Sequence, residues 1–154
     1  MTLAIQSSGF KDGGSIPTKY TGDGSDVSPP LSWSSVPPEA VELALIAEDP
    51  DAPGPFPFVH WVAYKIPAQS RGLQEGAAGK PPGGILQGTN SFGKSGYDGP
   101  APPPGSPHHY QFRLYALDHA LHAGPDLDRK GLLAAMEGHV LTEGVLVGTY
   151  QRSS

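Results

Sequence analysis

The residues best suited to do chemistry are two aspartates and two histidines that stand beside short apolar runs. Asp49 ends the apolar run 41–49, and Asp51 follows two residues later. His60 lies nine residues after Asp51, and His108 stands at the entry of a later run. Strand ends hold side chains rigidly next to variable loops, so these four groups can converge. Carboxylates that hold imidazoles would then direct ring N–H groups toward a small anion such as phosphate.

Two other interpretations of the same residues remain open. Asp49 and Asp51 each stand close before a proline, so they can be ordinary turn residues, with His60 a satisfied core histidine. A metal site needs three or four ligands at fixed distances. Asp-x-Asp and two histidines could supply them, although no short His-x-x-x-His spacing supports this. A serine nucleophile is disfavoured because no serine stands in a Gly-x-Ser-x-Gly elbow.

The apolar runs that would position these groups have the length and pattern of β-strands. They are short, apolar or rich in β-branched and aromatic residues, and bounded by turn residues. Four such runs cover residues 41–49, 57–67, 109–118 and 143–152. Period-2 alternation in the second run predicts that one face carries Phe58, His60, Val62 and Tyr64.

One later segment has helical spacing instead. Its apolar residues are Leu132, Leu133, Met136 and Val140, and Asp126 or Asp128 can serve as the N-cap. Irregular stretches rich in glycine and proline separate the apolar runs, and neither a repeat nor a domain boundary is visible. The pattern predicts a single, mainly β domain over residues 1–154, of sandwich type with a late helix.

The composition narrows the classes of partner. The 154 residues carry a formal net charge of −5 with no basic stripe, which disfavours nucleic acid and anionic membranes. There is no cysteine, so disulfides and thiolate chemistry are excluded. No apolar stretch approaches the roughly 18 residues of a membrane span, and no signal peptide is visible. We expect a cytoplasmic protein without stable membrane insertion, a metal site or a cofactor.

The stretch GTNSFGKS at 88–95 fits the P-loop pattern of nucleotide-binding proteins. A working P-loop follows a strand and opens a helix whose N-terminus helps to hold the phosphates. Here Gly-Tyr-Asp-Gly and a run of prolines follow Ser95, and prolines cost about 3 kcal/mol each in a helix interior. We therefore interpret the match as accidental.

Four motifs in order resemble the phosphatidylethanolamine-binding protein family, in its bacterial Raf-kinase-inhibitor-like branch. They are SPPLSW at 28–33, DPDAP at 49–53, HWV at 60–62 and GPAPPPGSPHHYQFRLYALD at 99–118. The resemblance extends over nearly the whole chain. It implies two antiparallel sheets packed as a β-sandwich-like domain, with one or two short helices near the C-terminus.

The resemblance also implies a small cavity that binds phosphate-like anions or phospholipid head groups such as phosphoethanolamine. The matching positions are Asp49, Asp51, Pro53, His60, Gly99, Ala101, Pro102, His108 and Tyr110. By this resemblance, His60, His108 and a loop N–H would donate hydrogen bonds to the ligand. Asp49 and Asp51 would fix those imidazoles or accept an ammonium, and Tyr110 would form a wall.

Family members are not generally enzymes, so the resemblance implies a non-enzymatic modulator of a protein kinase or an inhibitor of a serine protease. It also admits a homodimer. The alternative is a metal-assisted phosphoesterase using the same aspartates and histidines. Three departures bear on the pocket: His109 replaces an arginine, Ser91 replaces an aspartate, and the segment 105–108 is shorter than in some relatives. If the absent arginine and aspartate are ion-pair partners, their joint loss would be nearly neutral.

Overall fold

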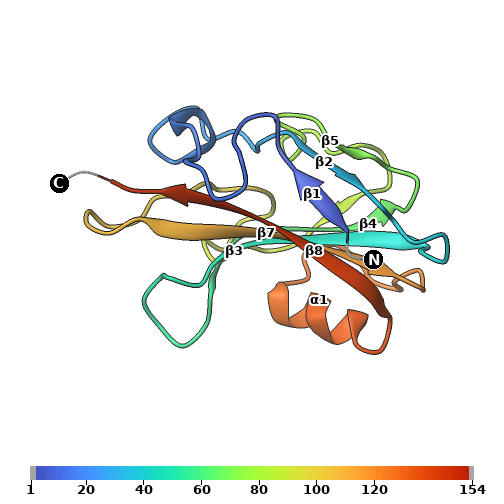
Figure 1. Ribbon diagram of the computed structural model, residues 1–154. Coiled ribbons are helices and arrows are strands. Elements are labelled where there is room, and N and C mark those ends of the chain that lie inside the picture. Colours follow the sequence, from blue (N-terminus) through green and yellow to red (C-terminus); the bar gives the residue numbers. More distant parts are fainter. Residues whose placement is uncertain (1–2, 153–154) are drawn as a thin grey trace.

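The computed structural model describes residues 3–152, which form two antiparallel sheets and a C-terminal helix (Figure 1). The larger sheet has the strand order β6-β4-β3-β7-β8, and the smaller has the order β1-β2-β5. The larger sheet comprises β3 (Glu42–Asp49), β4 (Phe58–Pro67), β6 (Leu86–Gln87), β7 (His108–Leu117) and β8 (Val140–Tyr150). The smaller sheet comprises β1 (Ala4–Gln6), β2 (Leu31–Ser34) and β5 (Gly72–Leu73). The helices are the 3-10 turn η1 (Thr18–Tyr20) and α1 (Arg129–Met136).

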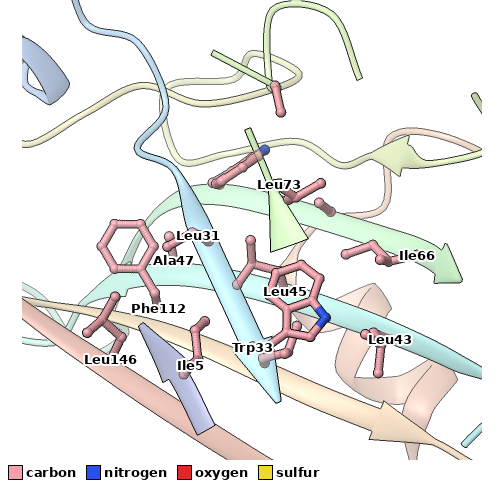
Figure 2. Close-up of a cluster of buried hydrophobic side chains, with 14 of the residues drawn as sticks. Ile5, Leu31, Trp33, Leu43, Leu45, Ala47, Ile66, Leu73, Phe112 and Leu146 are labelled. Atoms are coloured by element: carbon pink, nitrogen blue, oxygen red, sulfur yellow. The ribbon is translucent and has the colours of Figure 1, made fainter. Parts of the chain in front are cut away.

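The main core lies between the two sheets. Figure 2 shows Ile5, Leu31 and Trp33 of the small sheet packing against side chains of the large sheet. The large-sheet partners labelled there include Leu43, Leu45, Ala47, Phe112 and Leu146. The buried indole of Trp33 donates a hydrogen bond to the carbonyl of Ser70 at 2.7 Å, so its polar atom is satisfied. Apolar burial of this kind is the main stabilising term of the sandwich.

A second core covers the opposite face of the large sheet. Helix α1 lies beneath the sheet in Figure 1, and its residues Leu132 and Met136 are fully buried. The Asp128 carboxylate accepts a hydrogen bond from the Gly131 N–H at 2.7 Å, as expected of an N-cap. Gly138 follows the helix with a positive φ of 82°, which explains why the helix ends before the predicted apolar position Val140.

Antiparallel pairing brings one end of three strands together. Asp49, the last residue of β3, pairs with Phe58, the first residue of β4. Glu48 pairs with Gln111 near the start of β7. The loops before β4 and before β7 therefore extend from the same end of the sheet, as Figure 1 shows. This end carries the candidate site.

Within residues 3–152 the structure confirms the mainly β class, the two antiparallel sheets and the expectation of one or two short helices near the C-terminus, of which it has one. The four long strands lie within three residues of their predicted bounds. The short strands β1, β2, β5 and β6 were not predicted, because two to four residues give too little alternation to recognise. Within residues 3–152, no helix has the length and apolar character needed to cross a membrane.

Candidate functional site

A small cavity opens at the end of the sheet where β3 stops and β4 and β7 begin. Its volume is about 190 Å³, below the roughly 300–1,000 Å³ of pockets for drug-sized ligands. It has room for a small ion with a short substituent, but little for an acyl chain. Its lining consists of Asp49, Ala52, Pro53, Phe58, His60, Phe92, Ala101, Pro102, Pro103, His108 and Tyr110.

Asp49 fixes one cavity imidazole. Its Oδ2 lies 2.6 Å from Nδ1 of His108, and its Oδ1 accepts the backbone N–H of Asp51 at 2.9 Å. Because a carboxylate only accepts, Nδ1 of His108 carries the proton, and Nε2 is the ring nitrogen left for a ligand. Asp49 is buried, and both of its oxygens have a hydrogen-bond partner in the protein, as a buried carboxylate requires.

His60 is held by backbone instead of by a carboxylate. Its Nδ1 donates to the carbonyl of Asp98 at 2.6 Å, and the Asp98 N–H donates to the His60 carbonyl at 3.1 Å. Burial lowers the pKa of His60, although the Asp98 carbonyl and nearby carboxylates oppose this shift. The ring is therefore neutral near pH 7, and its Nε2 accepts hydrogen bonds. This differs from the expected donation by His60 to the ligand.

A β-bulge directs His60 into the cavity. The pairing of β3 with β4 shifts between Ala47↔Trp61 and Glu48↔Val59, so His60 is the extra residue on β4. Its ring contacts that of Tyr110 at 5.2 Å, on the side of the core between the sheets. Val62 and Tyr64 pack in the core under the helix instead. The prediction that all four alternating residues share a face is wrong, since the bulge reverses the alternation.

Asp51 lies outside the cavity lining. Its Oδ2 accepts both the backbone N–H and the Nδ1–H of His109 at 2.8 Å. This hydrogen bond from the side chain of His109 is the main cause that lowers the pKa of Asp51. Asp51 thus orients His109, a half-exposed ring, and neither of the two cavity imidazoles expected for it. The pair anchors the loop after β3 to the start of β7.

The contact between Asp51 and His109 also bears on the ion pair considered for positions 109 and 91. The Ser91 hydroxyl accepts the N–H of Val59 at 2.8 Å, on the β4 side of the sheet. Strand β3 lies between β4 and β7, so His109 and Ser91 are separated by several strand spacings. The acid that faces position 109 is Asp51, which an arginine at that position would also meet.

Gly99 supports the site from behind and does not line it. Its N–H donates to Oδ1 of Asp26 at 2.7 Å, so it is not the loop N–H expected to meet the ligand. A Cβ added at Gly99 would lie 2.2 Å from the Tyr20 carbonyl oxygen. Glycine is therefore required by the close approach of two backbones.

The proline-rich rim is tied to the C-terminal end of the described chain. Arg152 forms a bidentate pair with Asp23, and its Nη1 donates to the Pro102 carbonyl at 3.4 Å. Gln151 donates to the Gly105 carbonyl at 2.6 Å. Of the three rim residues in the lining, Ala101 alone has a backbone N–H, since the other two are prolines.

Seven of the predicted residues line the cavity: Asp49, Pro53, His60, Ala101, Pro102, His108 and Tyr110. Sequence reasoning missed Ala52, Phe58, Phe92 and Pro103. Phe58 stands two residues before His60, so the strand period could have suggested it. The Phe58 ring meets that of Phe92 edge to face at 4.9 Å. Burial and the Asp49 carboxylate raise the pKa of the Tyr110 hydroxyl well above its usual value.

Phe92 comes from the stretch that fits the P-loop pattern. Residues 88–95 form a turn closed by a bridge between Thr89 and Ser95, and the segment 96–107 that follows contains no helix. The buried Asn90 organises this turn, since its Oδ1 accepts the N–H groups of Phe92 and Lys94. Its amide donates to Oδ2 of Asp98 at 2.8 Å. The segment therefore supports the cavity, and its structure agrees with an accidental match.

The arrangement favours a ligand that brings a proton. Two imidazoles face the cavity, and each uses its Nδ1–H on the protein, so neutral rings present Nε2 lone pairs. A hydrogen phosphate or monoester can donate its P–OH to such a nitrogen. Alternatively, one ring takes up a proton and donates to P–O⁻. Among the described residues, no lysine or arginine lines the cavity, so protonation must supply the positive charge.

Comparison with known proteins gives consistent matches over the full fold. The family described as phosphatidylethanolamine-binding protein matches residues 6–151. A UPF0098 protein of Methanothermobacter thermautotrophicus is 51% identical over 152 residues, covering 97% of this chain and 99% of the relative. A UPF0098 protein of Aquifex aeolicus is 42% identical over 154 residues, covering 97% of this chain and 89% of the relative.

Two solved structures are similar to the chain as well. CT736 of Chlamydia trachomatis, described as a phosphatidylethanolamine-binding protein homologue, superposes with a TM-score of 0.90 and 38% identity over 99% of both chains. YbcL of E. coli, described as a member of the mammalian PEBP family, superposes with a TM-score of 0.93 and 29% identity. The match covers 99% of this chain and 100% of YbcL. The chain belongs to the phosphatidylethanolamine-binding protein family.

Proposed function

We propose that the cavity binds a phosphate monoester or inorganic phosphate as a protonated anion. The observation that carries the proposal is that His60 and His108 face one small cavity, with each Nδ1 engaged by the protein. Family membership supports a role as a binding protein. The aromatic and proline walls suit a short organic substituent such as ethanolamine.

Calorimetric titration tests this function. We expect saturable binding of O-phosphoethanolamine and of inorganic phosphate, and none of ethanolamine alone. His108→Ala should weaken binding at least tenfold, since it removes a polar group that meets the ligand. His109→Ala is the matched control because it removes the neighbouring, half-exposed imidazole outside the lining. Equal losses in both variants, or no binding by the wild type, would refute the proposal.

The same cavity would act by binding and not by catalysis. Both Asp49 oxygens are committed to His108 and to the backbone of Asp51, which leaves little of this carboxylate for a metal ion. The phosphoesterase alternative predicts release of phosphate from a monoester with added divalent metal, abolished by EDTA. Turnover that follows the metal and disappears in His108→Ala would replace the binding function with an enzymatic one.

The rim of the cavity would be the surface that contacts other proteins. The loop 98–107 is rich in proline and fastened by Gln151 and Arg152, so docking a partner orders little additional chain. Phe56 and Phe92 remain 76% and 44% exposed in the loops near the cavity, as anchors for a partner would be. The partner class is a serine protease or a protein kinase. Stoichiometric protein should slow such an enzyme, and unchanged rates in a panel of both classes would refute this modulator role.

A further inference from the structure

A second group of histidines lies at the other end of β7 from the cavity. His119, His122 and His139 surround the end of this strand, with Asp118 beside them. At about 3.4 Å per residue, β7 separates this group from His108 by about 30 Å. In Figure 1 the segment after β7 and the cavity loops extend from opposite ends of the sheet. The group therefore belongs to neither the cavity nor its rim.

The ring contacts within the group are close. The rings of His119 and His139 are nearly parallel, with centroids 4.8 Å apart, and those of His119 and His122 are 5.5 Å apart. His119 and His122 are exposed, and the His139 side chain is 41% exposed. Three imidazoles thus share a surface that a small solute can reach.

Backbone contacts fix the positions from which these rings extend. The Asp118 N–H donates to the His139 carbonyl at 3.0 Å, which joins the two segments. Leu121, between the other two histidines, is buried, and its N–H donates to Glu42 at 2.9 Å. Its carbonyl accepts from Lys65 at 2.7 Å. The three rings are therefore attached to an ordered frame, and ligand binding need order only side-chain rotamers.

The distances between the ring centroids are close to those of a metal centre, although the ring orientations are not. A Zn–N bond of about 2.0–2.1 Å places a ligand ring centroid about 3.2 Å from the ion, and a tetrahedral angle then puts two centroids about 5.2 Å apart. The observed separations of 4.8 and 5.5 Å lie on either side of this value. As placed within residues 3–152, no three histidine, aspartate or glutamate side chains are arranged to hold a metal ion. The His119 and His139 rings are within 22° of parallel, so at least one exposed ring must turn before their Nε2 atoms can meet at one ion.

The surrounding polar groups suit a cation held by imidazoles. Oδ1 of Asp118 lies 3.0 Å from Nδ1 of His139, which selects the Nδ1–H tautomer and leaves Nε2 for an ion. The cation facing the segment is Lys65, and it is paired with Glu42 at 3.0 Å. Three imidazoles with a carboxylate behind one of them form a donor set that favours Zn²⁺, Cu²⁺ or Ni²⁺ over Mg²⁺ or Ca²⁺.

We propose that His119, His122 and His139 form a binding site for one divalent transition-metal ion, with Asp118 as the positioning carboxylate. The fourth coordination position stays with water, as in open three-histidine zinc sites. The site is independent of phosphate binding in the distant cavity.

Zinc titration of the full chain, prepared without a histidine tag, tests the site. Calorimetry should show saturation at one equivalent of Zn²⁺ and no saturation with Mg²⁺. Ring signals of the three ligands should shift in NMR spectra, and EDTA should reverse the shifts. His119→Ala, His122→Ala and His139→Ala should each weaken binding at least tenfold, and Asp118→Asn by about tenfold. The variants should keep the melting temperature of the metal-free wild type, because they alter exposed positions.

His108→Ala is the matched control, since it removes a histidine from the cavity and should leave the zinc affinity unchanged. Phosphate binding by His119→Ala should equal that of the wild type, which separates failure of this site from failure of the cavity. Zinc affinity that falls in His108→Ala instead of the three ligand variants would overturn the proposal. Binding that does not saturate at one equivalent would also overturn it.

Discussion

Oδ2 of Asp49 lies 2.6 Å from Nδ1 of His108, while the next aspartate in the motif, Asp51, binds His109 at 2.8 Å. Two adjacent histidines at the start of β7 are thus held by two aspartates of one turn, but the cavity is lined by the first pair only. This difference makes the two aspartates a matched pair for mutation.

Asp49→Ala should weaken phosphate binding by about tenfold, because His108 loses the acceptor that fixes its ring and tautomer. Asp51→Ala should weaken it less than threefold, because the affected imidazole lies outside the cavity. Calorimetry on both variants measures this difference, with thermal unfolding as the check on folding. Equal losses of affinity would show that the turn acts only as a scaffold.

The buried His60 should make stability fall in mild acid. Its pKa is lowered in the folded state, chiefly by burial, so the unfolded chain binds a proton first as the pH falls below the ordinary value of about 6.5. Its contribution is intact above that pH and is lost as the pH falls toward the lowered folded pKa.

Urea unfolding at pH 7.5 and at pH 5.5 measures this loss in the wild type and in His60→Gln. The wild type should lose more unfolding free energy, by at most about 1.4 kcal/mol per pH unit for one proton. Other ionisable groups are shared by the two proteins, so their contributions cancel. Identical losses would contradict the assignment of a buried neutral imidazole.

Phosphate binding should take up protons near pH 7.5. The phosphate group of a monoester has its second pKa near 6 and is mostly a dianion at this pH. Each cavity ring uses its Nδ1–H on the protein, so a hydrogen bond between Nε2 and the phosphate needs an added proton on one of the two partners. Calorimetry in buffers of different ionisation enthalpy should give binding enthalpies that differ in proportion. An enthalpy independent of the buffer would mean that the dianion binds through donors other than these rings.

Double-mutant cycles distinguish the two partners considered for position 109. His109→Ala with Asp51→Asn should show a coupling of about 0.2–1 kcal/mol, typical of an exposed ion pair. His109→Arg with Ser91→Asp should be additive within about 0.5 kcal/mol, because β3 separates the two positions. Coupling in the second cycle and none in the first would reverse the assignment.

Gly99→Ala should destabilise the protein by about 1–3 kcal/mol, because the new methyl group would overlap the Tyr20 carbonyl and the Asp26 carboxylate. Gly83→Ala is the control, since a Cβ at that position meets no atom within 4 Å. Chemical denaturation of the two variants gives the comparison. Similar stabilities would show that the loop before β7 shifts freely to make room.

The long strands could be predicted from their length and composition, and Asp49, His60 and His108 from their positions in the strands or at the strand ends. The resemblance to the family was needed for Pro53, Ala101, Pro102 and Tyr110. The contribution of Phe92 could not be predicted, because its position depends on the hydrogen bonds by which Asn90 holds the turn and binds Asp98. The orientation and protonated nitrogen of His60 could not be predicted from the sequence either. Its inward orientation comes from a bulge, and its proton is committed to a carbonyl 38 residues along the chain. A hydrogen bond to a backbone carbonyl does not depend on the type of the partner residue, so the sequence cannot indicate it.

The most direct test of the account is the ¹⁵N spectrum of the histidine rings during titration with O-phosphoethanolamine at pH 7. Without ligand, His60 should be the Nδ1–H tautomer, and added ligand should shift the Nε2 signals of His60 and His108. The Nε2 signal of His109 should shift much less, because this ring lies outside the cavity. An Nε2–H tautomer for His60, or ligand-induced shifts centred on His109, would contradict the assignment of the cavity as the phosphate site.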